Sequence, residues 1–176
     1  MSRIAIAAAL SLAVLAACKK DDSSSSSGPA AKPAEAKLAF KKLGGLPLEA
    51  EIPGDANVDD ATKTAGFPSV TIYAQPTFFV MGGNGDVGDI KPTMDAEKTS
   101  LQHDMNGFKQ FTRSDKTADG WIIELEGSSM VDNKPLYGVA VRRAIGGMSW
   151  DCTTNADSKD EVAKVEKECA SLRAAK

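Results

Sequence analysis

The sequence predicts an α+β fold, with an antiparallel sheet of about six to seven short strands and two helices, the C-terminal helix being packed on the sheet. Three observations support this fold class. Strand-like runs follow one another with only two helical patterns among them, which favours an antiparallel sheet. The pair Gly146-Gly147 separates two apolar extended runs and predicts a tight hairpin. Ser158 and Glu161 form a capping box, which predicts the start of the last helix.

The first half of the folded region predicts three strands. Residues 48–52 alternate apolar and acidic side chains and stop at the turn signal Pro53-Gly54-Asp55. Residues 70–74 and 77–81 are rich in β-branched and aromatic side chains, which favour strands, and Gln75-Pro76 separates them. The glycine-rich stretch 82–88 is expected to be a loop, because Gly83, Gly85 and Gly88 lack the βαβ context of a dinucleotide fingerprint.

A helix is predicted over residues 94–106. Met94, Leu101, Met105 and Phe108 fall on one face at helical spacing, and Gly107 is placed to end the helix. His103, the single histidine, points away from that face, so it has no partners for a zinc site or a catalytic triad.

The second half predicts four strands and the closing helix. A weak strand near residues 109–113 precedes residues 121–126, and residues 137–145 and 148–154 flank the Gly-Gly turn. If the two glycines form the loop, the predicted cross-strand pairs are Ile145 with Met148, Arg143 with Trp150, Val141 with Cys152, and Arg142 with Asp151, the last as an ion pair. The order of elements resembles, at fold level, that of the small PsbP/Mog1-like α+β domains.

Two cysteines are predicted to meet in a disulfide. The hairpin register points Cys152 at the sheet face that carries Val141 and Trp150, and Cys169 lies on the apolar stripe of the last helix. A bridge would close a loop of about 17 residues, worth about 3 kcal/mol on the chain-entropy account. Two buried thiols and a redox-active pair are the alternatives.

The N-terminal pattern predicts an export signal. After Arg3, the fourteen residues from Ile4 to Ala17 are uncharged, too few for the roughly 20 that cross a bilayer and suited to a secretory signal. Leu15-Ala16-Ala17-Cys18 resembles the lipobox of bacterial lipoproteins. The resemblance implies that residues 1–17 are removed as a signal peptide and that Cys18 receives diacylglyceryl and acyl (palmitate-type) chains. The alternative is an ordinary signal peptide with a spare cysteine.

Residues 18–37 are expected to form the lipidated cysteine and a flexible tether. This segment is rich in Ser, Pro and Ala and contains no large apolar side chain, so it cannot offset the entropy of folding. Its mean reach is about 25 Å. Residues 38–176 then form a single domain. Because Lys19 rather than Asp follows Cys18, the lipoprotein resemblance implies the outer membrane rather than the inner membrane.

Charge limits the partners. The chain has 21 basic and 24 acidic side chains, and removal of the signal takes away only Arg3. This acidic balance argues against a nucleic-acid partner, which needs a basic face. The expected attachment to a membrane is therefore through the lipid on Cys18.

The sequence predicts a non-enzymatic binding or structural module of the cell envelope, on the periplasmic or outer side of a membrane, with an envelope protein as candidate partner. It predicts no catalytic residue, cofactor or metal site. Arg143 and Trp150 are candidate ligand contacts, because the register places a cation on the face with Trp150, where it binds an anion or packs its stem on the ring. The alternative function is an envelope hydrolase whose site forms no motif; the pair Glu124 and Glu126 is more typical of a solvated sheet face than of a glycosidase.

Overall fold

The computed structural model describes residues 36–83, 90–105 and 107–176. The chain divides into two units, Met1–Ala34 and Glu35–Lys176, and every described residue belongs to the second. Cys18, the tether apart from Ala36 and Lys37, and most of the glycine-rich stretch therefore lie outside the described residues, as does Asn106 at the predicted end of a helix.

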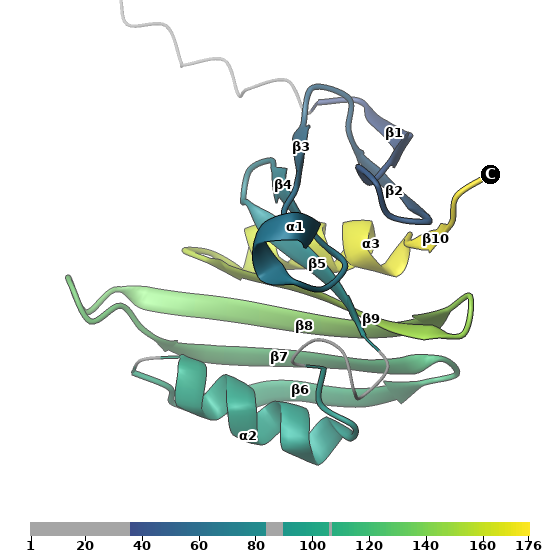
Figure 1. Cartoon of the computed structure of the whole chain (residues 1–176). Coiled ribbons are helices and arrows are strands. Elements are labelled where there is room, and N and C mark those ends of the chain that lie inside the picture. The colour runs from purple at the N-terminus through teal and green to yellow at the C-terminus, as the bar shows by residue number, and fades with distance from the viewer. Residues whose placement is uncertain (1–35, 84–89, 106) are drawn as a thin grey trace, which may run out of the picture. The chain divides into compact units, whose positions relative to one another are not determined.

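A seven-stranded antiparallel sheet forms the main frame (Figure 1). Its spatial order is β3 (Asn57–Asp60), β4 (Ser69–Tyr73), β5 (Phe78–Gly83), β9 (Met148–Ala156), β8 (Pro135–Ile145), β7 (Gly120–Ser128) and β6 (Gln110–Thr117). The molecule is thus strand-rich with mixed α and β elements, as the sequence predicts.

A second, three-stranded sheet was not predicted. It has the order β1 (Leu38–Lys42), β2 (Leu48–Pro53) and β10 (Arg173–Ala174). The predicted strand at residues 48–52 is present as β2, but it belongs to this sheet and not to the main one. The physical reason is that alternation fixes which side chains face a core, here Leu48 and Ile52, whereas it does not choose the neighbouring strand.

Both predicted helices are present, and the described residues contain an additional single-turn helix that was not predicted. The helices are α1 (Thr62–Ala65), α2 (Met94–Asp104) and α3 (Lys159–Ala170). The predicted helix start is confirmed, because the Ser158 hydroxyl accepts a hydrogen bond from the Glu161 backbone N–H at 3.3 Å and donates one to Glu161 Oε2 at 3.0 Å. Helix α2 ends at Asp104, earlier than predicted, since Met105 adopts an extended conformation.

The predicted hairpin register is confirmed. Gly146 and Gly147 have φ of 64° and 79°, the left-handed region that a two-residue hairpin loop needs. The pairs between β8 and β9 then fall as predicted: Ile145 opposes Met148, Arg143 opposes Trp150, Arg142 opposes Asp151 and Val141 opposes Cys152.

The main core lies on one face of the seven-stranded sheet. Helix α3 packs on β8 and β9 there, and β2 adds Leu48, Ala50 and Ile52 to the same cluster. Helix α2 contacts the strands through other side chains: Glu97 reaches Arg142 on β8, and Lys98 lies 4.6 Å from the centre of the Phe111 ring on β6. Helix α2 therefore covers part of the sheet face that points away from the main core, and the described residues leave the rest of that face uncovered.

Candidate functional site

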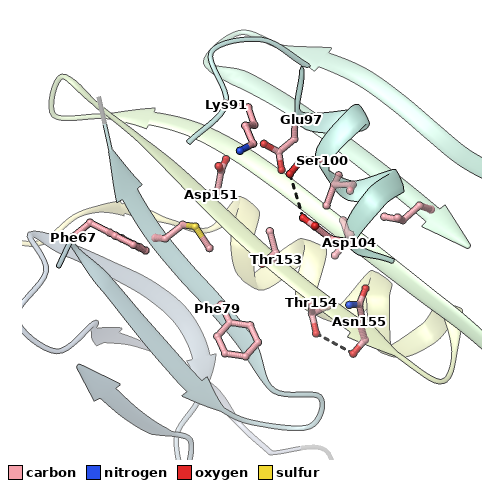
Figure 2. Close-up of a pocket in the computed structure, with 14 residues that line it drawn as sticks. Phe67, Phe79, Lys91, Glu97, Ser100, Asp104, Asp151, Thr153, Thr154 and Asn155 are labelled. Atoms are coloured by element: carbon pink, nitrogen blue, oxygen red, sulfur yellow. Dashed lines mark hydrogen bonds between the residues drawn. The ribbon is translucent and has the colours of Figure 1, made fainter. Parts of the chain in front are cut away.

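A groove of about 420 Å³ runs between helix α2 and strand β5 (Figure 2). We call it the α2 groove. Its floor is the face of β9 that points away from the main core, with Asp151, Thr153 and Asn155. Its remaining side chains come from β5, α2 and the neighbouring loops and strands: Phe67, Phe79, Met81, Lys91, Glu97, Ser100, Leu101, Asp104, Leu125, Val139 and Thr154.

One wall of the α2 groove is apolar. Alternation along β5 buries Phe78 and Val80 in the main core and turns Phe79 and Met81 to the opposite face. Phe79 is 46% exposed although it lines the groove, and Phe67 comes from the loop before β4. An exposed aromatic wall of this kind can bury apolar area against a ligand.

The opposite wall is polar. Glu97, Ser100 and Asp104 are spaced three and four residues apart, so they share one side of α2 and reach the groove together. The Ser100 hydroxyl donates a hydrogen bond to Asp104 Oδ2 at 3.1 Å (Figure 2). Thr93 caps the helix by accepting from the Ala96 N–H, which fixes where this polar side begins.

A buried charge cluster holds α2 against the sheet at one end of the groove. Arg142 donates through Nε and Nη2 to the two carboxylate oxygens of Asp151, the second contact being 2.7 Å, so the predicted ion pair is confirmed. Its Nη1 donates to the Lys91 carbonyl oxygen at 2.8 Å, and its Nη2 lies 3.4 Å from Glu97 Oε2. The guanidinium also lies 4.2 Å from the Trp121 ring centre.

Burial governs the electrostatics of this cluster. Arg142, Asp151 and Glu97 are 4%, 4% and 7% exposed. Burial raises the pKa of Asp151 above its ordinary value, and the Arg142 guanidinium opposes that shift. Because the loss of one partner would leave a buried charge uncompensated, the cluster is expected to fix the position of α2 tightly.

The predicted ligand contacts lie elsewhere. Trp150 is 1% exposed in the main core, and its indole N–H donates to the Ile145 carbonyl oxygen at 3.2 Å. Arg143 Nε lies 2.5 Å from Asp119 Oδ2, and its Nη1 donates to the Ala170 carbonyl oxygen. Burial alone would raise the pKa of Asp119, but the hydrogen bond and charge of Arg143 outweigh it and lower the pKa. Ligand binding by Arg143 and Trp150 stays a prediction.

The two domain cysteines lie where the sequence predicts. Cys152 on β9 and Cys169 on α3 are at disulfide distance, with Cα atoms 5.7 Å apart, and both are fully buried. This is consistent with a covalent link between the closing helix and the centre of the sheet.

Glu97 and the groove itself were not predicted. Glu97 lies three residues after Met94 and four before Leu101, so it sits on the face that the sequence identified as apolar. A charged residue on an apolar face indicates a buried partner of opposite charge. That partner, Arg142, lies 45 positions away, so the sequence does not identify it. His103 is exposed on α2, as expected.

Within the described ranges, no group of three or more His, Cys, Asp or Glu side chains is placed to hold a metal ion. No helix in this part of the chain is both long and apolar enough to span a bilayer.

Comparison of the sequence with models of known protein families and with curated proteins found no match. What the protein does must therefore be inferred from its own residues.

Proposed function

We propose that the protein is a lipid-anchored lipoprotein of the cell envelope, and that residues 38–176 form a non-enzymatic module that binds an envelope partner in the α2 groove. Lipid on Cys18 is the proposed anchor, residues 19–37 are the tether, and the outer membrane is the proposed location. The observation that supports binding is the groove of about 420 Å³ with an exposed aromatic wall. Sites of this size and mixed lining are typical of ligand and partner recognition.

The arrangement of the acids favours binding over catalysis. Asp151 and Glu97 contact Arg142, and Asp104 accepts a hydrogen bond from Ser100 within α2, so each groove carboxylate already has a partner in the protein. By contrast, Phe79 presents nearly half of its surface to solvent on a strand that is paired on both sides. A partner that covers this ring gains apolar burial without reordering the site.

Photocrosslinking in intact cells tests the binding proposal. A photoreactive phenylalanine analogue replaces Phe79 in the full chain, and a matched variant carries it in place of Phe40, which is 43% exposed on β1. Light should produce a discrete adduct from position 79 and none of the same mass from position 40. Equal labelling at both positions, or none at position 79, would refute the groove as the binding site.

Lipid labelling tests the anchor separately. Radiolabelled palmitate should enter the wild-type chain and be lost in Cys18→Ser, whereas Cys152→Ser should keep the label. Unchanged labelling of Cys18→Ser would refute the lipoprotein proposal.

A hydrolase is the second candidate, favoured by the raised pKa of Asp151 in a groove with two further carboxylates. It predicts turnover of ester or glycoside probes that is lost in Asp104→Asn, at an exposed position outside the buried cluster. Turnover that survives this substitution would point away from the groove.

A further inference from the structure

The turn between β7 and β8 exposes two adjacent large apolar side chains. Met130 is 72% exposed and Val131 is 96% exposed, the highest values among the large hydrophobic side chains that the structure describes. Single exposed apolar residues are common on soluble proteins, but two together at the end of a long hairpin form a protruding apolar tip. We call residues 129–134 the apolar tip.

Hydrogen bonds within the turn define the backbone conformation of the apolar tip. The Ser129 N–H donates to the Lys134 carbonyl oxygen at 2.8 Å, and the Asn133 N–H donates to the Ser129 carbonyl oxygen at 2.9 Å. The Ser129 hydroxyl accepts from the Val131 N–H at 3.3 Å. Asn133 has φ of 56°, in the left-handed region that Asn tolerates better than most residues. These contacts hold Met130 and Val131 outward on a fixed backbone.

The charges of the tip form a neutral pair. Asp132 Oδ2 lies 2.7 Å from Lys134 Nζ. A neutral pair is drawn to an anionic surface less than a basic patch is, and it is repelled less than a lone acid is. The chemistry of the tip thus suits an uncharged apolar medium next to water, which is the boundary between headgroups and acyl chains of a bilayer.

We propose that the apolar tip inserts into the membrane that carries the Cys18 anchor, and so orients the domain on that membrane. This inference depends on the proposed lipid anchor. The nineteen residues from Lys19 to Lys37 extend to about 65 Å, whereas a domain of this length has a radius of gyration of about 14 Å. The proposed tether is therefore long enough for the apolar tip to reach the membrane surface in any orientation of the domain.

The proposed tether also compensates for the weak membrane affinity of two side chains. One Met and one Val are too small an apolar area to bind a membrane from solution. Attached through the proposed tether, the domain is held at an effective concentration in the millimolar range, at which weak insertion becomes populated. The tip then acts as the second contact of an anchored protein.

Fluorescence quenching by lipid tests this proposal on the mature chain, Cys18–Lys176. The chain is attached to vesicles of phosphatidylethanolamine and phosphatidylglycerol, through its native lipid or by coupling Cys18 to a maleimide lipid. Tryptophan is introduced as Met130→Trp, or as the control Ala118→Trp in the exposed turn at the other end of β7. Brominated acyl chains quench a ring that enters the bilayer, and each variant is compared with the wild type to subtract Trp121 and Trp150.

The expected result is quenching at position 130 at least twofold above that at position 118, reduced to the level of position 118 when Val131→Asp is added. Equal quenching at both positions would overturn the insertion, even if the chain floats with the vesicles. The chain could lack a native lipid and still show quenching at position 130 once Cys18 is coupled to the maleimide lipid. This result would refute the lipoprotein proposal and support insertion of the apolar tip. If a photoreactive residue at position 130 crosslinks a protein in intact cells, and the vesicles show no lipid quenching at that position, the tip binds a protein partner instead.

Discussion

Glu168 gives the sharpest stability prediction in the domain. It lies on α3 between Val165 and Leu172 of the buried stripe, and it is 2% exposed. Neither carboxylate oxygen has a hydrogen-bond partner among the described residues. Burial therefore raises the pKa of Glu168 from 4.5 to about 7, against a weak opposing attraction from Lys164.

The sign and size of the effect follow from linkage. Well below pH 4.5 the carboxyl is protonated in both the folded and unfolded states, so it does not change the unfolding free energy. Between pH 4.5 and about 7 the unfolded chain releases the proton while the folded protein keeps it, so stability falls as pH rises. Each tenfold difference in proton affinity is about 1.4 kcal/mol, which gives a loss of at most about 3 kcal/mol above pH 7.

Glu168→Gln keeps the shape of the protonated side chain and cannot ionise. Its unfolding free energy should match that of the wild type well below pH 4.5 and exceed it by up to about 3 kcal/mol at pH 8. Urea denaturation followed by tryptophan fluorescence, with the cysteines oxidised, measures this difference across the pH range. Asp160→Asn, at an exposed position on the same helix, is the control and should change stability by about 0.5 kcal/mol or less.

Two outcomes would refute the reasoning. A difference between Glu168→Gln and wild type that is constant with pH would mean that the Glu168 carboxyl titrates alike in both states. A variant that is less stable than the wild type at pH 8 would mean that the charged carboxylate has a favourable partner.

Three further predictions follow from other contacts. Reduction, or Cys169→Ala together with Cys152→Ala, should lower the unfolding free energy by about 2–4 kcal/mol, and thiol labelling of the unreduced, denatured wild type should find neither of these cysteines free. Arg142→Met should cost about 3–5 kcal/mol because it removes the guanidinium that pairs with the buried carboxylate of Asp151, whereas adding Glu97→Gln should recover part of that loss in a double-mutant cycle. Ser158→Ala should cost about 1 kcal/mol through loss of the helix cap, with thermal unfolding as the measurement.

Elements with a local signal could be predicted in detail. Gly146-Gly147 sets the hairpin loop, and one loop sets the register of both strands, so the Arg142–Asp151 pair and the inward position of Cys152 followed from sequence. The capping box at Ser158 likewise fixed the start of α3. In each case the information lies within a few residues of the element.

Elements that depend on distant partners could not be predicted. Strand β10 is two residues long and exists because Arg173 and Ala174 pair with β2, more than 120 positions earlier. Strand β1 starts directly after the tether, and its exposed Leu38 and Phe40 give no alternation to read. Pairings across such distances leave no periodic trace in the short strand itself.

The α2 groove belongs to the second group, and β9 shows why. Asp151, Thr153 and Asn155 alternate with core residues, so they share one face of the strand, and sequence alone predicts one solvated polar face. In the structure Asp151 is 4% exposed while Asn155 is exposed. The contact of Glu97 with Arg142 holds α2 over the Asp151 end, and beyond that end the same face lies open as the groove floor. Docking of α2 therefore makes both the buried cluster and the groove, and a substitution that frees α2 should remove the groove without unpairing the sheet.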